Sequence, residues 1–343
     1  EKALQKFKKI ASDFQGTGEA VQAIATARLI YIDTGRVDDY AAWIRGLDYV
    51  EVTDVELDNT MYAAAEKPFL DGDTDKAIRQ FNKYLNQFPN GIHVLKSHFY
   101  LAQMYYNKDL FRNAQPHYTF VVDASKRDFS EPALLRLCEF QLASNNWSAA
   151  LPLLQRLENE ADYPQNELYA QSNLMNAYYQ LQDYANAQTY AEKVLNNSKL
   201  EEKIQSDAHL VIARAAMETG NEPKAKEAYA EVQKIATGKV AAEALYFDAY
   251  FKHKEGSYES SNAIVQKLAK DYSSYKYYSS KGLVVMAKNF YELDDAFQAT
   301  YILESVISNF TEFNDVVEEA RQELKKIKSE QAKTNASVEN KDN

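Results

Sequence analysis

The sequence is poor in cysteine, glycine and proline, and it lacks a long apolar run. Its 343 residues include a single cysteine, Cys138, with 10 Gly and 7 Pro. One cysteine excludes an internal disulfide and a metal site built from several thiolates. No apolar stretch approaches the roughly 20 residues that a membrane-spanning helix needs. In a chain that is 45% hydrophobic, these absences favour a soluble, helix-rich protein without direct membrane insertion.

Positive charge is also in deficit. The chain has 39 Lys and Arg residues against 50 Asp and Glu residues, and its net charge is −11. A polyanion such as DNA or RNA would meet net repulsion instead of the basic stripe that neutralises phosphates. We therefore expect no nucleic-acid partner. The first residues lack the apolar segment and cleavage site of a signal peptide, which leaves open a leader that has been removed.

The sequence repeats itself with a period near 37 residues. The stretch "KALQKFKKIASDF" at residues 2–14 is echoed by "KAIRQFNKYLNQF" at residues 76–88. One position of each period, usually a small residue that follows a turn, anchors the alignment of the repeats. These anchors are Ala3, Tyr40, Ala77, Ala114, Ala150, Ala187, Ala225, Ser261 and Thr300, at intervals of 36 to 39 residues. A fixed period of this length is the signature of a solenoid of stacked repeats.

Each period predicts two amphipathic helices. In residues 93–106, Leu95, Phe99, Ala102 and Tyr106 recur at steps of three and four, which places them on one helix face. The turn "NKDL" follows, and a second periodic stretch begins after it. We therefore predict an all-α solenoid of eight two-helix repeats, with a leading half repeat and a C-terminal capping helix.

The helix pairs resemble the tetratricopeptide repeat family. That family places a small residue twelve positions before each anchor, where this chain has Ala65, Ala102, Cys138, Met175, Ala213 and Ala249. It also places an aromatic residue in the turn, where this chain has Phe111, Trp147, Tyr184, Tyr258 and Phe297. The period exceeds the family's 34 residues, Arg28 and Lys288 replace the small residue in the outer repeats, and Pro68 lies late in a first helix. The resemblance implies a right-handed α–α superhelix that acts as a protein-interaction scaffold.

The last third of the chain, from "YKYYSSKGLVV" onward, also resembles long repeat proteins of the Bacteroidota cell envelope. That similarity implies a periplasmic or outer-membrane-associated location and a longer parent chain. We expect residues 1–15 to be the second helix of a truncated repeat, residues 16–310 to be repeats and residues 311–328 to be the capping helix. Residues 329–343 are polar, and we expect a disordered tail or a frayed helical extension there.

The family resemblance further implies a concave groove lined by the first helices, at positions fifteen, eleven and eight before each anchor. Tyrosine is frequent at these positions, and it provides a large amphipathic contact area at little entropic cost. The alternative for each side chain is packing or plain surface. The candidates for protein binding are Tyr62, Glu66, Phe99, Gln103, Tyr106, Glu139, Asn176, Tyr179, Arg214, Tyr246 and Tyr250. The Lys, Asn and Arg set with which some family members clamp a terminal carboxylate is missing from these positions, which disfavours chaperone tails as partners.

Other motifs indicate structure more than chemistry. "DGDTD" at residues 71–75 starts like a calcium loop, but Asn82 stands where that loop needs a bidentate Glu, so we expect Asp73 or Thr74 to cap a helix. "GTG" lacks the strand and the further residues of a phosphate loop, and we expect an interhelical turn. His93 and His98 are five residues apart and fall on different helix faces, so we expect no metal site.

Two further features have a functional and a structural interpretation. Cys138 would be a nucleophile only beside a base in an electropositive setting, and its repeat position favours a buried structural thiol. An acidic run from Asp48 to Asp58 favours a solvated loop and helix start over a docking surface for a basic partner.

The sequence thus predicts a non-catalytic protein–protein interaction scaffold without cofactor or metal. A peptide or protein partner would bind in the concave groove, and the Bacteroidota resemblance implies a role in envelope assembly or transport. The alternative is a recruiting or regulatory arm of a larger enzyme whose catalytic domain lies N-terminal to residue 1. The sequence makes no prediction of the partner's identity or of the oligomeric state.

Overall fold

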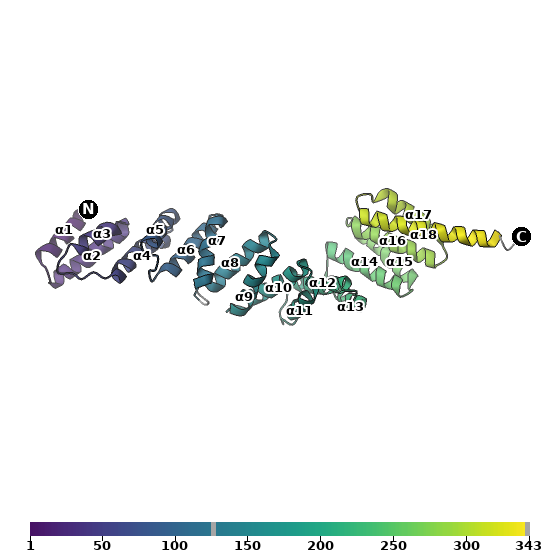
Figure 1. Cartoon of the computed structure of the whole chain (residues 1–343), viewed down its shortest axis with the longest axis horizontal. Coiled ribbons are helices and arrows are strands. Elements are labelled where there is room, and N and C mark those ends of the chain that lie inside the picture. The colour runs from purple at the N-terminus through teal and green to yellow at the C-terminus, as the bar shows by residue number, and fades with distance from the viewer. Residues whose placement is uncertain (125–127, 340–343) are drawn as a thin grey trace. The chain divides into compact units, whose positions relative to one another are not determined.

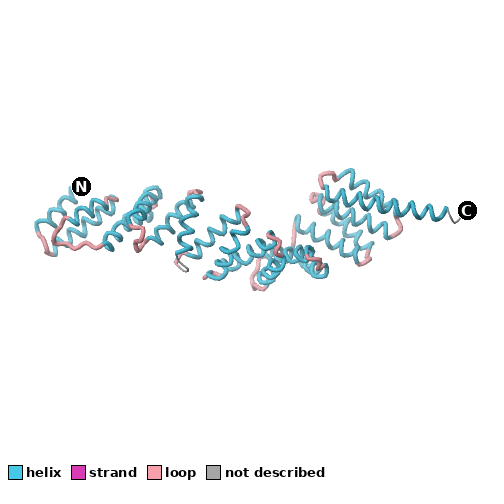
Figure 2. Tube along the Cα trace, viewed as in Figure 1, coloured by secondary structure: helices cyan, strands magenta, loops and turns pink. Residues whose placement is uncertain are grey.

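The structure, a computed structural model, describes residues 1–124 and 128–339, and all regular elements in this part of the chain are α-helices. The chain divides into two compact units, Glu1–Glu167 and Leu168–Asn343 (Figure 1). Figure 2 shows that loops join successive helices in each unit. The 18 helices of the described residues match the expected half repeat, eight helix pairs and capping helix, so the all-α prediction is confirmed.

Successive helices pack against one another within the first unit. Its helices are α1 (Lys2–Asp13), α2 (Gly18–Thr34), α3 (Val37–Arg45), α4 (Asp54–Leu70), α5 (Thr74–Gln87), α6 (Val94–Asn107), α7 (Phe111–Ala124), α8 (Ser130–Ala143) and α9 (Trp147–Glu160). From α2 onward, even numbers are the first helices of pairs and odd numbers the second helices. The helix α10 (Pro164–Gln180) begins in this unit and ends in the next.

The second unit has the same arrangement, and its successive helices from α11 onward are also in contact. They are α11 (Tyr184–Leu195), α12 (Glu202–Glu218), α13 (Glu222–Ile235), α14 (Gly238–Lys254), α15 (Tyr258–Asp271), α16 (Lys276–Glu292), α17 (Ala296–Asn309) and α18 (Asn314–Glu339). In addition, α14 packs on α16 and α16 on α18. The last helices of this unit therefore form one packed group (Figure 1).

Small residues at the predicted repeat positions let the two helices of a pair approach closely. Five of the alanine anchors are completely buried, with exposed fractions of 0%: Ala77, Ala114, Ala150, Ala187 and Ala225. The positions twelve residues earlier are buried to the same extent, at 0%, in Ala65, Ala102, Cys138, Ala213 and Ala249. Since interiors are close-packed, a larger side chain at these positions would force the helices apart.

The turns within the pairs share a two-residue device. The first residue is left-handed, with φ of 81° at Gly72 and 54° at Asn145. The next residue caps the second helix: the Asp73 side chain accepts a hydrogen bond from the backbone N–H of Lys76. The same cap recurs at Asn146, Asp183, Asn221 and Asp295. The "DGDTD" stretch is therefore a helix cap, as expected, and Thr17 of "GTG" likewise caps α2.

The capping helix continues beyond its predicted end. It was expected to stop at residue 328, but α18 extends to Glu339. Its buried side chains, which include Val316 and Ile327, pack on α16 and α17. The sequence left the tail from residue 329 as either disordered or helical, and the described part of it is helical. Residues 340–343 lie outside the described residues.

Candidate functional site

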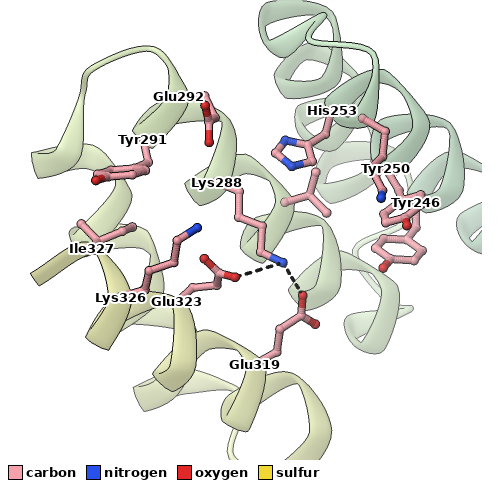
Figure 3. Close-up of a pocket in the computed structure, with 12 residues that line it drawn as sticks. Tyr246, Tyr250, His253, Lys288, Tyr291, Glu292, Glu319, Glu323, Lys326 and Ile327 are labelled. Atoms are coloured by element: carbon pink, nitrogen blue, oxygen red, sulfur yellow. Dashed lines mark hydrogen bonds and ion pairs between the residues drawn. The ribbon is translucent and has the colours of Figure 1, made fainter. Parts of the chain in front are cut away.

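A pocket with a volume of about 350 Å³ lies in the second unit between α14, α16 and α18 (Figure 3). Its lining residues are Tyr246, Tyr250, His253 and Lys254 from α14, Val285, Lys288, Tyr291 and Glu292 from α16, and Glu319, Glu323, Lys326 and Ile327 from α18. Two predicted groove residues, Tyr246 and Tyr250, line this pocket. Both residues lie on α14, one helical turn apart.

Tyr246 and Tyr250 differ in their surroundings: the first is buried, and the second is held through its hydroxyl. Tyr246 is only 8% exposed, and the ammonium of Lys281 lies 5.2 Å from its ring centroid. The hydroxyl of Tyr250 donates a 2.8 Å hydrogen bond to Glu222 on α13. Burial, with the hydrogen bond and charge of Glu222, raises the pKa of Tyr250 to about 12. Tyr250 is therefore a neutral phenol at physiological pH.

The tautomer of His253 is fixed by a buried amide behind it. The Nδ2 atom of Asn289 donates to the Oγ of Ser261 and to the Oδ1 of Asn262, each at 2.8 Å. The Oδ1 atom of Asn289 therefore faces the Nδ1 of His253, at 2.7 Å. Because an amide oxygen only accepts, Nδ1 of His253 must carry a proton. In its neutral form this ring has its lone pair on Nε2, and Figure 3 shows the ring at the edge of the pocket.

An ion-pair group closes the pocket on the side of the capping helix. The ammonium of Lys288 lies 2.7 Å from a carboxylate oxygen of Glu319 and 3.7 Å from one of Glu323 (Figure 3). Lys288 stands where other repeats have a small residue, and its long side chain reaches from α16 to α18. The sequence showed that Lys288 departs from the repeat pattern, but it did not show which residues Lys288 pairs with. At the pocket rim, Lys326 and Glu292 make no ion pair with the described residues, so charges of both signs face the space.

In the first unit, two of the predicted groove residues are core residues instead. Tyr62 is 5% exposed and its ring stacks on His93 with centroids 4.0 Å apart. Its hydroxyl donates to Glu66 at 2.6 Å. Phe99 is 7% exposed and stacks on Phe129 at 4.5 Å. Both rings pack mainly within this unit, which is the packing alternative left open for these positions.

A second predicted pair in this unit stays partly accessible. Tyr106 and Glu139 are both partly buried, and the Tyr106 hydroxyl donates to Glu139 at 3.2 Å. Arg136 donates to the same carboxylate at 2.8 Å, and its guanidinium lies 4.4 Å from the Tyr106 ring centroid. The three side chains form one partly exposed surface between α6 and α8. Gln103, also predicted for the groove, is partly buried.

Arg214 does not present a free positive charge in the second unit. Its Nε and Nη2 atoms donate to the two carboxylate oxygens of Glu243 at 2.7 and 2.6 Å. Hydroxyls of Tyr229 and Tyr278 donate to the same carboxylate. Burial alone would raise the pKa of Glu243, but the hydrogen bonds and charge of Arg214 outweigh it and hold that pKa below its usual value. The guanidinium of Arg214 is therefore paired within this unit.

The remaining predicted groove residues of this unit, Asn176 and Tyr179, are both partly buried. The ring of Tyr179 lies 5.8 Å from that of Tyr184, between centroids. Burial raises the pKa of the Tyr179 hydroxyl. Their placement is compatible with packing as well as with a binding surface.

The structural interpretation holds for the cysteine. Cys138 is 0% exposed, and burial together with the charge of Glu139 raises the pKa of its thiol to about 12. It is therefore not a thiolate at neutral pH. From the acidic run, Asp58 is buried and accepts hydrogen bonds from the Tyr84 hydroxyl at 2.6 Å and the backbone N–H of Ile92 at 2.8 Å.

Metal ligands are sparse in the part of the chain that the structure describes. It holds no group of three or more His, Cys, Asp or Glu side chains that could bind a metal ion. The structure does bring one pair of histidines together, His98 on α6 and His117 on α7. The sequence gave no signal for this pair, because the two residues are 19 positions apart and belong to different helices.

The helix pairs and their register define an α-helical repeat protein. Residues 60–91, which span most of α4 and α5, match the family model "Tetratricopeptide repeat". The successive helix pairs of the described residues are similar to that repeat in their fold. None of the curated proteins matches the chain. No helix among the described residues is long and apolar enough to cross a membrane.

Solved structures of similar fold come from several bacteria. A tetratricopeptide repeat protein of Parabacteroides merdae is 14% identical, with a TM-score of 0.38, over 77% of this chain and 98% of that chain. PilF of Pseudomonas aeruginosa is 16% identical, with a TM-score of 0.41, over 65% of this chain and 97% of that one. The quorum sensor NprR of B. thuringiensis, in its apo form, is 10% identical, with a TM-score of 0.46, over 92% and 94%.

Proposed function

We propose that this chain is a non-catalytic scaffold that binds a peptide or protein partner, with the pocket between α14, α16 and α18 as one anchor site. The observation that carries the proposal is the meeting of Tyr246, Tyr250 and His253 in one pocket of about 350 Å³. These residues come from one first helix, where the repeat register places groove contacts. Repeat proteins of this kind use the surface formed by successive repeats for binding.

The lining of the pocket favours a polar side chain of the partner. Tyrosine rings offer apolar area, while the free Nε2 of His253 and the rim groups of Lys326 and Glu292 offer hydrogen bonds and charge. Because the rim holds both signs of charge, the site does not need a partner of strongly negative character. A folded partner's loop or an extended peptide that inserts one polar side chain fits this chemistry.

We further propose that the scaffold works in the cell envelope, in assembly or transport, at a periplasmic or outer-membrane-associated location. The support is the resemblance of the last third of the chain to Bacteroidota envelope proteins. This part of the proposal is independent of the pocket, and fractionation of native cells with an antibody against the chain tests it. Recovery in the cytoplasmic fraction alone would contradict it.

The pocket is tested with the native partner, identified by crosslinking mass spectrometry in cells and then purified. Tyr250→Ala removes an aromatic anchor from the pocket, and we expect it to weaken binding by roughly 1 to 3 kcal/mol. The matched control is Tyr301→Ala, because Tyr301 lies on α17 outside the pocket and is 65% exposed. Binding is measured by isothermal titration calorimetry, and circular dichroism shows whether each variant is folded.

The proposal predicts a loss for Tyr250→Ala and unchanged affinity for the control. If both folded variants bind as tightly as the original chain, the pocket is not the anchor site. Equal losses in both would place the contact on the outer surface of the unit instead.

A further inference from the structure

Two histidines of neighbouring helices in the first unit point one ring nitrogen at each other. The Nδ1 atoms of His98 on α6 and His117 on α7 are 2.8 Å apart. The ring centroids lie 4.9 Å apart and the ring planes make an angle of 49°. In the neutral pair, one Nδ1 donates a hydrogen bond and the other accepts it. Among the described residues, no carboxylate makes a hydrogen bond to either of these two Nδ1 atoms.

Both imidazoles are in the form that ligates metal ions. Burial, with the charge of His117, lowers the pKa of His98 to about 4, and burial lowers the pKa of His117. A neutral imidazole offers its lone pair to a metal ion without first losing a proton.

Aromatic neighbours hold the two rings in place close to the surface. The ring of His98 stacks on Phe120 at 3.8 Å and 12°, and that of His117 stacks on Tyr105 at 5.7 Å and 21°. Both histidines are partly exposed, and Phe120 is 38% exposed, so that solvent and ions reach the pair. The site therefore combines an ordered pair of ligands with an open approach.

The nitrogen separation discriminates among metal geometries. Metal–nitrogen bonds to histidine are about 2.0 to 2.1 Å long. Two nitrogens in adjacent positions of a square-planar or octahedral ion are then about 2.9 Å apart, whereas a tetrahedral ion needs about 3.3 Å. The observed 2.8 Å fits the first arrangement. Square-planar or tetragonal nitrogen coordination is typical of Cu(II) and Ni(II).

We propose that His98 and His117 form a two-imidazole site for Cu(II), and more weakly for Ni(II), with water in the remaining coordination positions. The metal ion replaces the shared hydrogen bond, and the rings turn slightly so that both Nδ1 lone pairs converge on it. In the complex each imidazole carries its proton on Nε2, so the ring whose Nδ1 donated the shared hydrogen bond first moves that proton, through solvent, to its own Nε2. Because the ligands come from two helices, the ion links α6 to α7.

The experiment uses the full chain without a histidine tag, titrated with CuCl2 in the presence of glycine as a competing ligand for the metal. We expect one Cu(II) ion per chain at this site, and at least tenfold weaker binding in His98→Gln and in His117→Gln. Glutamine retains a hydrogen-bonding group of similar length, which favours folded variants, and circular dichroism checks this. The matched control is His209→Gln, because His209 is a partly buried histidine of the second unit without a histidine partner.

Electron paramagnetic resonance gives a readout that a change in packing would not produce. The Cu(II) spectrum of the original chain should show coupling to two imidazole nitrogens, and that of each single variant should lose one of them. Titration with NiCl2 and ZnCl2 should give the affinity order Cu(II), Ni(II), Zn(II). Tighter Zn(II) than Ni(II) binding would refute the proposed geometry. Unchanged Cu(II) affinity in a folded chain that carries both substitutions would overturn the site altogether.

Discussion

Replacement of Glu243 by Leu would remove the acceptor at the centre of a buried polar cluster. The Glu243 side chain on α14 is 3% exposed and receives hydrogen bonds from Arg214 on α12, Tyr229 on α13 and Tyr278 on α16. Loss of one partner of a buried ion pair costs roughly 3 to 5 kcal/mol. Water can reach Arg214, whose side chain is 35% exposed, so we expect the lower end, about 3 kcal/mol.

The complementary variant, Arg214→Met, leaves the carboxylate buried without its counter-ion. Arg214 now holds the pKa of Glu243 low against the effect of burial, so the pKa of this carboxyl should rise above its unfolded value in the variant. The folded variant then binds the proton more tightly than the unfolded chain, and its stability increases as the pH falls. In the original chain the lowered pKa of Glu243 contributes stability at neutral pH that is lost in acid.

Urea unfolding at pH 7 and pH 5, followed by far-ultraviolet circular dichroism, measures both effects. The two tryptophans, Trp43 and Trp147, lie in the first unit, so their fluorescence is an internal reference for that unit. The double variant Glu243→Leu with Arg214→Met leaves neither charge buried without its partner. Its loss of stability should therefore be smaller than the sum of the losses of the two single variants. Additive losses, or a loss below about 1 kcal/mol for Glu243→Leu, would show that this pair behaves like an exposed ion pair.

Two further predictions concern the first unit. A thiol reagent should label Cys138 slowly in the folded chain and rapidly in urea, and Cys138→Ala should cost about 1 kcal/mol or less, since one small buried group is removed; rapid labelling of the folded chain would contradict the buried thiol. Because the pKa of His98 is lowered from 6.5 to about 4, its contribution to stability is present above pH 6.5 and is lost as the pH falls toward 4. We expect His98→Phe to flatten this loss in urea titrations, and an unchanged pH profile would show that other groups cause it.

The repeat positions were predictable because they depend on local spacing. A small residue at Ala77 or Ala114 is required wherever two helices of a pair cross, so its recurrence reports the helix pairs directly. The caps followed for the same reason, since Asp73 bonds a backbone N–H only three residues away. Such features leave a signal within one period of the sequence.

Contacts between repeats left no comparable signal. Arg214 and Glu243 are 29 residues apart, and their pairing depends on which rotamers bring α12 and α14 side chains together. The groove register likewise predicted accessible rings at Tyr62 and Phe99. His93 and Phe129, from the segments that begin the next first helices, cover these two rings. Positions counted within a single repeat do not show which residues of the next repeat will stack on them.

The ion pairs among the candidate groove residues bear on how a partner would be chosen. Glu66 is already neutralised by Lys96, Glu139 by Arg136, and Arg214 by Glu243. The electric field of each ion pair is short-ranged, because the fields of opposite charges a few ångströms apart cancel beyond about one Debye length. If a partner binds at any of these positions, long-range attraction does not accelerate its encounter there, and salt should change the association rate little. Discrimination among partners falls to the lifetime of the complex, which depends on how well the aromatic surfaces fit.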